Sequence, residues 1–269
     1  MVKVLVTGAG GQLGQSIKRY CHLLNDLEFY YKDSSELDLT NQIQVKACLE
    51  MISPDYVINT AAYTAVDLAE SHKDQVFKVN VEAVEYLVEA IKGTNTKLIH
   101  LSTDFVFNGK SDRPYRETDT PEPINYYGFS KYLAEQVIEK ELKTNYFIIR
   151  TSWVYSEFGT NFFKTILRLA SNKESIAVVE DQIGNPTHTS VIVDALIWVI
   201  RSQTDKYGIY HVTGVDTCSW YDFAKKIVEQ YRLDLNVIPI KSFQYPTQAK
   251  RPYYSVLDNE KFEELKKRG

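Results

Sequence analysis

Cysteine is scarce in this sequence, and neither an excess of positive charge nor a long apolar run is present. The three cysteines, Cys21, Cys48 and Cys218, lie far apart and form no CxxC pair. They argue against a disulfide framework and predict reduced thiols in a cytoplasmic compartment. The net charge of −4 argues against a nucleic-acid surface. The most apolar stretch, 191–200, contains Asp194 and is too short to span a bilayer.

The first half of the chain alternates short apolar runs with amphipathic stretches. The runs predict strands at 2–7, 27–31, 56–59, 97–102 and 146–150. The stretches between them predict helices at 12–24, 42–51, 75–91 and 127–142. This alternation is typical of an α/β fold, and we expect a Rossmann-type, doubly wound parallel sheet covered on both faces.

The second half is less regular, with helices expected at 161–171, 190–201 and 220–231. The last of these follows Ser219, and Asp222 stands three residues later in the spacing of a capping box. No Gly/Ser linker separates the halves. We therefore expect a dinucleotide-binding domain at 1–150 and, packed on it, a smaller C-terminal lobe at 151–269 that mainly binds substrate.

A glycine-rich turn follows the first predicted strand and opens the first helix. Gly8, Gly11 and Gly14 have GxxGxxG spacing, which allows a tight turn and a close approach of the backbone to a pyrophosphate at the helix N-terminus. Such a turn is weak evidence alone, because glycine-rich loops are common. Its position at the first strand–helix junction strengthens the prediction of a dinucleotide site.

Tyr127 and Lys131 stand four residues apart and would share one face of a helix. A neighbouring ammonium favours the phenolate and so brings a tyrosine closer to proton transfer at neutral pH. The plain alternative is an amphipathic helix with a half-buried tyrosine and a solvated lysine. Further along this helix Glu135, with Glu139 and Glu141, is most simply part of a solvated face.

The end of the fourth predicted strand carries Ser102, Thr103 and Asp104. Ligands of open α/β sheets bind at the carboxyl ends of the strands, so these side chains favour a site shared with Tyr127 and Lys131. The five histidines show no metal-ligand spacing, and no GxSxG elbow marks a nucleophilic serine. No metal is expected.

The chain resembles the dTDP-4-dehydrorhamnose reductases, a family of extended short-chain dehydrogenases/reductases. The matching segments cover nearly the whole chain in order: TGAGGQLG (7–14), PDYVINTAAYTAVDLAE (54–70), STDFVF (102–107), YYGFSKYLAE (126–135), RTSWVY (150–155), NFFKTILRLA (161–170), DQIGNPT (181–187) and the pair Arg251-Pro252. The resemblance implies reduction of the C4 ketone of dTDP-4-dehydro-L-rhamnose to dTDP-L-rhamnose by NADPH, with NADH possible.

The resemblance also implies roles for individual residues. In the cofactor site, Gly8 and Gly14 would shape the turn, and the remaining contacts would come from Gly11, Gln12 and Leu13 along the pyrophosphate, Asp38 and Leu39 beside the adenine, and Ala62, Tyr63 and Thr64 beside the ribose and nicotinamide. In the catalytic site, Thr103 would bind the ketone, Tyr127 would donate the proton, and Lys131 would bind the ribose and tune Tyr127. Asp104, Trp153 and Arg251 would contact the substrate.

Several alternatives stay open at this point. One is a reductase of another nucleotide-linked 4-keto-6-deoxy sugar, and another is a non-catalytic regulatory subunit of the same fold, such as that of methionine adenosyltransferase. Some family members hold a magnesium ion between subunits through glutamates. The matching positions here are Ser16 and Ser190, and serine hydroxyls are poor replacements for carboxylates. We therefore expect a monomer or a weak dimer.

Overall fold

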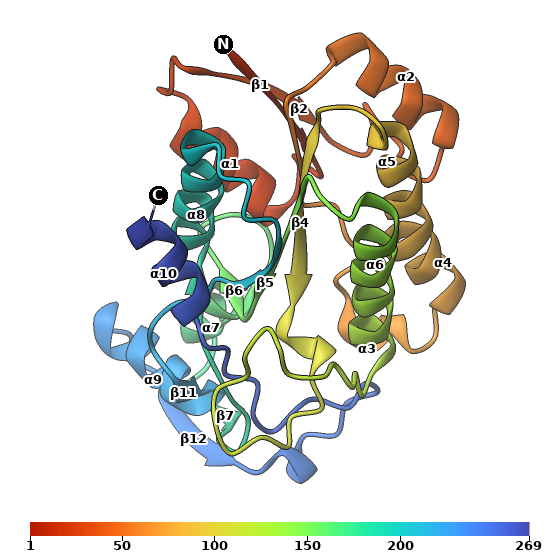
Figure 1. Ribbon diagram of the computed structural model, residues 1–269. Helices are drawn as coiled ribbons and strands as arrows, with labels where there is room; N and C mark the ends of the chain where they lie inside the picture. Colours follow the sequence, from red (N-terminus) through yellow and green to blue (C-terminus); the bar gives the residue numbers. More distant parts are fainter. Residues whose placement is uncertain (269) are drawn as a thin grey trace.

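A central sheet of six parallel strands organises the computed structural model, which describes residues 1–268 (Figure 1). The strand order is β10-β5-β4-β3-β1-β2, and every neighbouring pair is parallel. The strands are β1 (Val2–Thr7), β2 (Leu27–Lys32), β3 (Tyr56–Asn59), β4 (Lys97–Thr103), β5 (Tyr146–Thr151) and β10 (Gly208–His211). The Rossmann-type fold and all five strands predicted in the first half are confirmed, each within one residue at either end.

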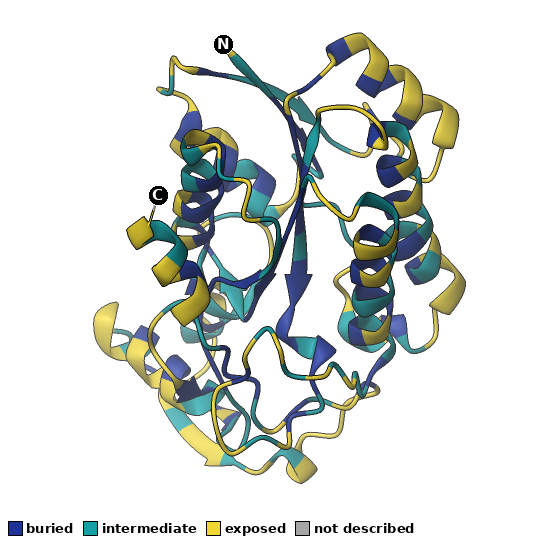
Figure 2. Cartoon of the chain, in the orientation of Figure 1, coloured by how far each residue is buried: buried dark blue, intermediate teal, exposed yellow. Residues whose placement is uncertain are grey.

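Helices cover both faces of the sheet. One face carries α1 (Gln12–Cys21), α8 (Thr189–Ser202) and α10 (Glu260–Arg268), and the other carries α2 (Gln42–Ile52), α5 (Ala83–Ile91) and α6 (Tyr126–Leu142). The middle strands are buried on both sides, as their continuous apolar sequence requires (Figure 2). Among residues 1–268 no helix has the length and apolar character needed to cross a membrane.

The helix predicted at 75–91 is divided in the structure. Two short helices, α3 (Val66–Ala69) and α4 (Lys73–Phe77), lead into a π-helical turn, η1 (Lys78–Glu82), and only then into α5. The buried Asn80 in this turn accepts a hydrogen bond from the backbone N–H of Tyr63 at 2.7 Å and donates one to the hydroxyl of Ser130 at 2.9 Å. The π-turn thus ties the loop after β3 to α6, a placement typical of functional sites.

A second hydrophobic cluster lies in the C-terminal part, where β7 (Ser175–Val179) pairs with β12 (Asn236–Ile240) beside α7 (Phe162–Ala170) and α9 (Trp220–Gln230). The predicted capping box of Ser219 and Asp222 at the start of α9 is confirmed. Short pairs join β6 (Val154–Tyr155) to β9 (Thr187–His188) and β8 (Ile183–Gly184) to β11 (Cys218–Ser219). Although α8 and β10 follow residue 150 in the sequence, they belong to the layer of the central sheet. The chain therefore returns to the first predicted domain after α7 and β7, and the domain boundary at residue 150 stays a prediction.

Glu135 is wholly buried, so its prediction as part of a solvated helix face is wrong. Its carboxylate accepts hydrogen bonds from Nε and Nη2 of Arg150 at 2.9 and 2.6 Å, and both side chains are at most 1% exposed. Ser102 also donates to Glu135, and the Arg150 guanidinium lies 5.1 Å from the centre of the Phe107 ring. This ion pair joins α6 to β4 and β5 in the interior.

We expect Glu135→Gln to lower the free energy of unfolding by about 3–5 kcal/mol, because it leaves the Arg150 charge buried without its partner. Urea unfolding followed by circular dichroism measures this. Glu141→Gln on the same helix is the matched control, since Glu141 pairs with Lys92 at the surface, and it should cause little change. Equal stability of the two variants would contradict this account of the interior.

Candidate active site

The glycine turn between β1 and α1 has the geometry of a cradle for a pyrophosphate. Gly8 has a φ of +69°, and a Cβ there would lie 2.6 Å from the backbone nitrogen of Ala61. A Cβ on Gly14 would lie 2.6 Å from the carbonyl oxygen of Gly8. Gly11 is the N-cap of α1 and has no side-chain cap, so the first N–H groups of the helix are available to an anion. The residues present therefore fit a dinucleotide.

The loop after β2 lies beside this turn. The N–H of Ala9 donates to the carbonyl oxygen of Lys32 at 3.0 Å. Asp33 accepts hydrogen bonds from the backbone and hydroxyl of Ser35, which hold the pKa of its carboxyl below the ordinary value. The Asp33 carboxylate is thus engaged within its own turn. Within residues 1–268 the Lys32 ammonium forms only a long ion pair with Glu36, at 3.7 Å.

The other predicted cofactor residues lie on loops that leave the same edge of the sheet. Asp38 and Leu39 follow β2, and Ala62, Tyr63 and Thr64 follow β3, the two strands that flank β1. Asp38 and Thr64 are exposed, and the other three are partly buried. At the start of α1, Leu13 packs against the core, and Gln12 donates to the carbonyl oxygen of Val154 at 3.1 Å. The structure therefore brings the predicted set to one edge.

The first turn of α6 approaches the end of β4 closely. Asn125 caps the helix by accepting a hydrogen bond from the N–H of Gly128 at 2.8 Å, and its amide donates to the carbonyl oxygen of Lys250 at 2.9 Å. A Cβ on Gly128 would collide with the carbonyl oxygen of Phe105, which lies in the 3-10 turn η2 (Asp104–Val106). Only glycine lets the two backbones pack at this distance.

This packing brings Tyr127 close to Thr103, the two residues for which the resemblance implies roles at the ketone. The Thr103 hydroxyl lies close enough to the Tyr127 hydroxyl to affect its pKa. Burial raises the pKa of Tyr127 to about 12, an effect that the Thr103 hydroxyl partly offsets and the charge of Asp104 increases. The expectation that Lys131 brings this pKa down is therefore not met. A tyrosine with a raised pKa stays protonated at neutral pH and suits the role of proton donor.

Lys131 is buried one helical turn further on, with only 2% of its surface exposed. Its Nζ lies 3.0 Å from Nε2 of His100 in β4. Burial lowers the pKa of Lys131 to about 8, and the nearby Glu135 carboxylate partly opposes this. The solvated lysine of the plain alternative is thus wrong, and Lys131 titrates close to neutral pH.

Asp104 lies beneath the site and is 2% exposed. Its Oδ1 accepts a hydrogen bond from Thr103 at 3.0 Å, whereas Oδ2 has no partner among residues 1–268. Burial raises the pKa of Asp104 to about 7, and the hydroxyls of Ser255 and Thr103 partly oppose this effect. The carboxyl is therefore poised to hold or release a proton near neutral pH, in contact with the hydroxyl that contacts Tyr127.

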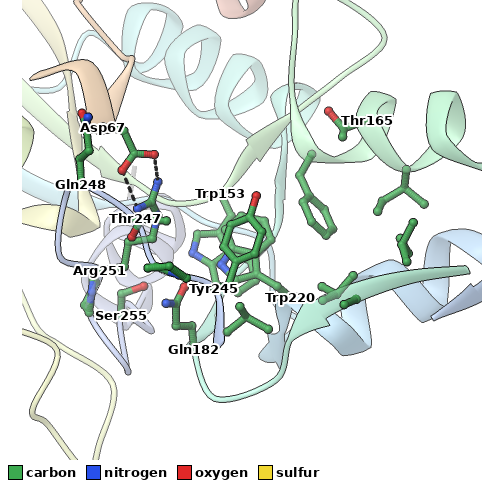
Figure 3. Close-up of a pocket in the computed structure, with 18 of the residues that line it drawn as sticks. Asp67, Trp153, Thr165, Gln182, Trp220, Tyr245, Thr247, Gln248, Arg251 and Ser255 are labelled. Atoms are coloured by element: carbon green, nitrogen blue, oxygen red, sulfur yellow. Dashed lines mark hydrogen bonds and ion pairs between the residues drawn. The ribbon is translucent and has the colours of Figure 1, made fainter. Parts of the chain in front are cut away.

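A cavity of about 630 Å³ lies mainly in the C-terminal part (Figure 3). Within residues 1–268 its lining includes Phe105 of η2 but neither Thr103 nor Tyr127. Trp153 and Trp220 line it together and stack with ring centres 3.5 Å apart and planes 6° apart. Trp153 has a φ of +46°, and a Cβ on Gly184 would lie 2.5 Å from its ring. Such backbone strain persists where the surroundings fix it and is often functional. Trp153 thus lies where it was predicted, whereas Asp104 does not line this cavity.

Arg251 lines the same cavity and is held by Asp67 of α3. Its Nη1 and Nη2 donate to the two carboxylate oxygens of Asp67 at 3.0 and 2.7 Å, and this pairing lowers the pKa of Asp67 (Figure 3). Nη1 also donates to the carbonyl oxygen of Ala249 at 3.1 Å. Three of the five N–H donors of the Arg251 guanidinium are thus used. Among residues 1–268 no acceptor contacts the N–H of Nε. The Nε–Nη2 edge is a paired donor of the kind that binds phosphate.

Some functional residues were not found from the sequence. Asp67 and Asn125 carry no chemical motif, although Asp67 falls in the matched segment 54–70. Trp220 is a helix residue whose contact with Trp153 depends on the tertiary fold. No group of three or more His, Cys, Asp or Glu side chains that could hold a metal occurs within 1–268. Ser16 is buried and bonded to Thr189 at 2.8 Å.

The fold and this site define a Rossmann-type dehydrogenase/reductase in which a dinucleotide cradle, a Tyr–Lys helix and a substrate cavity meet at one sheet edge. Residues 2–268 match the family described as "RmlD substrate binding domain". The chain belongs to this family. A curated dTDP-4-dehydrorhamnose reductase from Aggregatibacter actinomycetemcomitans is 42% identical over 98% of this chain and 93% of its own. One from Escherichia coli K12 is 37% identical over 98% and 91%.

Solved structures agree with this assignment. A Bacillus anthracis dTDP-4-dehydrorhamnose reductase in complex with NADP superposes with a TM-score of 0.93 at 39% identity, covering 98% of this chain and 93% of that one. A UDP-glucose 4-epimerase from Thermus thermophilus has a TM-score of 0.84 at 19% identity, covering 98% and 93%. The epimerase likeness shows the fold alone.

We expect Gly128→Ala to reduce turnover by about 10²-fold, because the added methyl group moves α6 off η2 and displaces Tyr127 from Thr103, and a shift of about 1 Å can have this effect. Steady-state kinetics measures it. Gln136→Ala, on the exposed side of α6, is the control and should turn over normally. Unchanged kinetics in a folded Gly128→Ala protein would show that the close contact does not position Tyr127.

Proposed function

We propose that this protein catalyses the reduction of dTDP-4-dehydro-L-rhamnose to dTDP-L-rhamnose with NADPH as the reductant. The observation that carries the proposal is the protonated Tyr127 beside Thr103 at the carboxyl end of β4, in the same parallel sheet whose first strand leads into the glycine turn. The identity of the relatives as dTDP-4-dehydrorhamnose reductases supports the substrate, and the NADP complex of the Bacillus anthracis structure supports the cofactor.

In this mechanism the side chains orient the ketone and move one proton. NADPH, when bound, supplies the hydride to the C4 carbon. Thr103 turns its hydroxyl from Asp104 to donate a hydrogen bond to the carbonyl oxygen, and Tyr127 gives its proton to that oxygen as negative charge develops on it. Lys131 binds the cofactor ribose. Arg251, held by Asp67, offers its Nε–Nη2 edge to the nucleotide diphosphate, and the stacked tryptophans shield the sugar from water.

The substrate assignment is tested by an assay over a panel of nucleotide-linked 4-keto sugars, following the loss of nicotinamide absorbance. The proposal expects turnover with dTDP-4-dehydro-L-rhamnose and formation of dTDP-L-rhamnose. Turnover of only another 4-keto-6-deoxy sugar would identify a related reductase. No turnover with any ketone would favour a non-catalytic regulatory subunit.

Tyr127→Phe should lower turnover by about 10²–10⁴-fold, the usual contribution of general acid catalysis. NADPH binding, measured by fluorescence titration, should remain close to that of the unmodified protein because the glycine turn is untouched. Tyr126→Phe is the neighbouring control, as its hydroxyl has no hydrogen bond among residues 1–268. Near-normal turnover of Tyr127→Phe would exclude Tyr127 as the proton donor.

We further propose that the enzyme prefers NADPH but tolerates NADH, because Lys32 is available to a 2′-phosphate whereas Asp33 is engaged by Ser35. Lys32→Ala should reduce the preference by about tenfold, the value of one charge-assisted hydrogen bond. The ratio of kcat/KM for the two cofactors measures this, with the exposed Lys46→Ala as control. A strong preference for NADH that Lys32→Ala leaves unchanged would refute this interpretation of the loop.

We propose a monomer or weak dimer that needs no metal and acts in the cytoplasm. The three free, buried thiols suit a reducing compartment. At the positions of the interface glutamates, Ser16 is committed to Thr189 and Ser190 to His188. Turnover and sedimentation should be the same before and after EDTA treatment. Loss of both activity and a dimer, with recovery on adding magnesium, would overturn this proposal.

A further inference from the structure

His100 is a wholly buried histidine that the mechanism above does not use. It lies in β4 three residues before Thr103, and its exposed fraction is 0%. Its Nδ1 lies 3.1 Å from Nδ2 of Asn59 in β3, and its Nε2 lies 3.0 Å from the nitrogen of Lys131 in α6. The imidazole ring thus bridges the neighbouring strand and the catalytic lysine, and both ring nitrogens are occupied.

The surroundings of Asn59 decide which ring nitrogen carries the proton. The backbone N–H of Ala61 donates to Oδ1 of Asn59 at 3.2 Å, and the hydroxyl of Thr7 donates to the same oxygen at 2.8 Å. Because a backbone N–H can only donate, this atom of Asn59 is the oxygen, and the NH₂ group faces His100. Nδ1 of His100 must then accept, and a neutral ring that accepts at Nδ1 carries its proton on Nε2.

The proton on Nε2 points at Lys131. An ammonium group has only donors, so a charged Lys131 would place its N–H against the Nε2–H of His100 in the interior. A neutral amine has a lone pair that can accept a hydrogen bond from Nε2. We propose that His100 is a positioning residue for Lys131, donating from Nε2 to the lysine nitrogen and favouring its neutral amine. The amine keeps two N–H donors, which remain available for the hydroxyl groups of a cofactor ribose.

The ionisable groups around this pair agree with the assignment. Burial, together with the charge of Lys131, lowers the pKa of His100 well below its ordinary value, so the ring is neutral. The ionisable groups on the adjoining elements include Tyr127 and Glu135 on α6, Arg150 on β5 and Asp104 on η2, and of these Glu135 acts on Lys131. Glu135 would favour the ammonium, but its carboxylate is bound by Arg150 at 2.6 Å. Tyr127 is protonated, and Asp104 contacts Thr103.

The consequence for catalysis rests on the proposed function. In that function the positive charge of Lys131 helps to bind the cofactor or to stabilise the transition state, and His100 sets the pH at which Lys131 loses this charge. An ordinary lysine would keep its charge to about pH 10, whereas Lys131 begins to lose its proton near pH 8 or below. Activity should therefore fall as the pH rises through this range, and a change at His100 should move the fall.

The proton position can be measured directly in the full-length protein labelled with ¹⁵N-histidine, without substrate. The signals of His100 are identified by their loss in His100→Gln. The proposal expects a neutral ring at pH 7 with the proton on Nε2 and an unprotonated Nδ1. A proton on Nδ1, or a charged ring, would overturn it. This measurement does not depend on enzyme activity. If His100→Gln does not fold, the His100 signals can still be identified by assigning those of the other four histidines through their own substitutions.

The effect on Lys131 is measured by titrating the protein labelled with ¹³C-lysine, with Lys131→Met to assign the signal. In His100→Gln the amide oxygen can accept from an ammonium, so the pKa of Lys131 should rise by about one unit or more. The alkaline fall in kcat/KM should move upward by the same amount. His22→Gln, at the exposed end of α1, should change neither. An unchanged or lower pKa of Lys131 in His100→Gln would refute the proposal, even if the protein proved to reduce a different ketone.

Discussion

The close approach of α6 to the turn after β4 is the constraint on which the site depends. Gly128 lets the helix backbone rest on the carbonyl oxygen of Phe105, and the helix then presents a stripe of side chains to β4. Tyr127 meets Thr103, Lys131 meets His100, and Glu135 meets Ser102. The spacing of four residues keeps the three on one face. The same helix face therefore supplies the proposed proton donor, the lysine proposed to bind the cofactor, and the buried ion pair that fixes the helix in place.

Much of the fold could be predicted because short patterns in the sequence indicate its strands and helices. The apolar runs marked the five strands of the first half, and Ser219 with Asp222 marked the start of α9. The glycine turn and the Tyr127–Lys131 spacing located two parts of the site from local sequence alone. Their meeting at one sheet edge follows from the parallel strand order, since the carboxyl ends of such strands lie together.

The remainder depends on contacts between distant parts of the chain. Glu135 looks like a surface residue until Arg150 is placed beside it, because an isolated carboxylate on a helix gives no sign of burial. Arg251 finds Asp67 only once the C-terminal loop returns to α3. The raised pKa of Tyr127 likewise arises from burial, and the spacing of Tyr127 and Lys131 suggested the opposite direction. Local sequence thus identified chemical groups, and tertiary packing determined their protonation.

The place of β10 in the sheet has a consequence for how the chain matures on the ribosome. β5 ends at Thr151, yet the strand that pairs with its outer edge begins at Gly208. While the intervening segment is being synthesised, β5 has an unpaired edge, and one sheet face also awaits α8. Unpaired edges and uncovered apolar faces are sites of aggregation in nascent chains. We therefore infer that the central sheet completes its folding only after β10 has been synthesised. The segment between β5 and β10, which includes α7 and β7, would then fold together with the sheet and not as a separate domain.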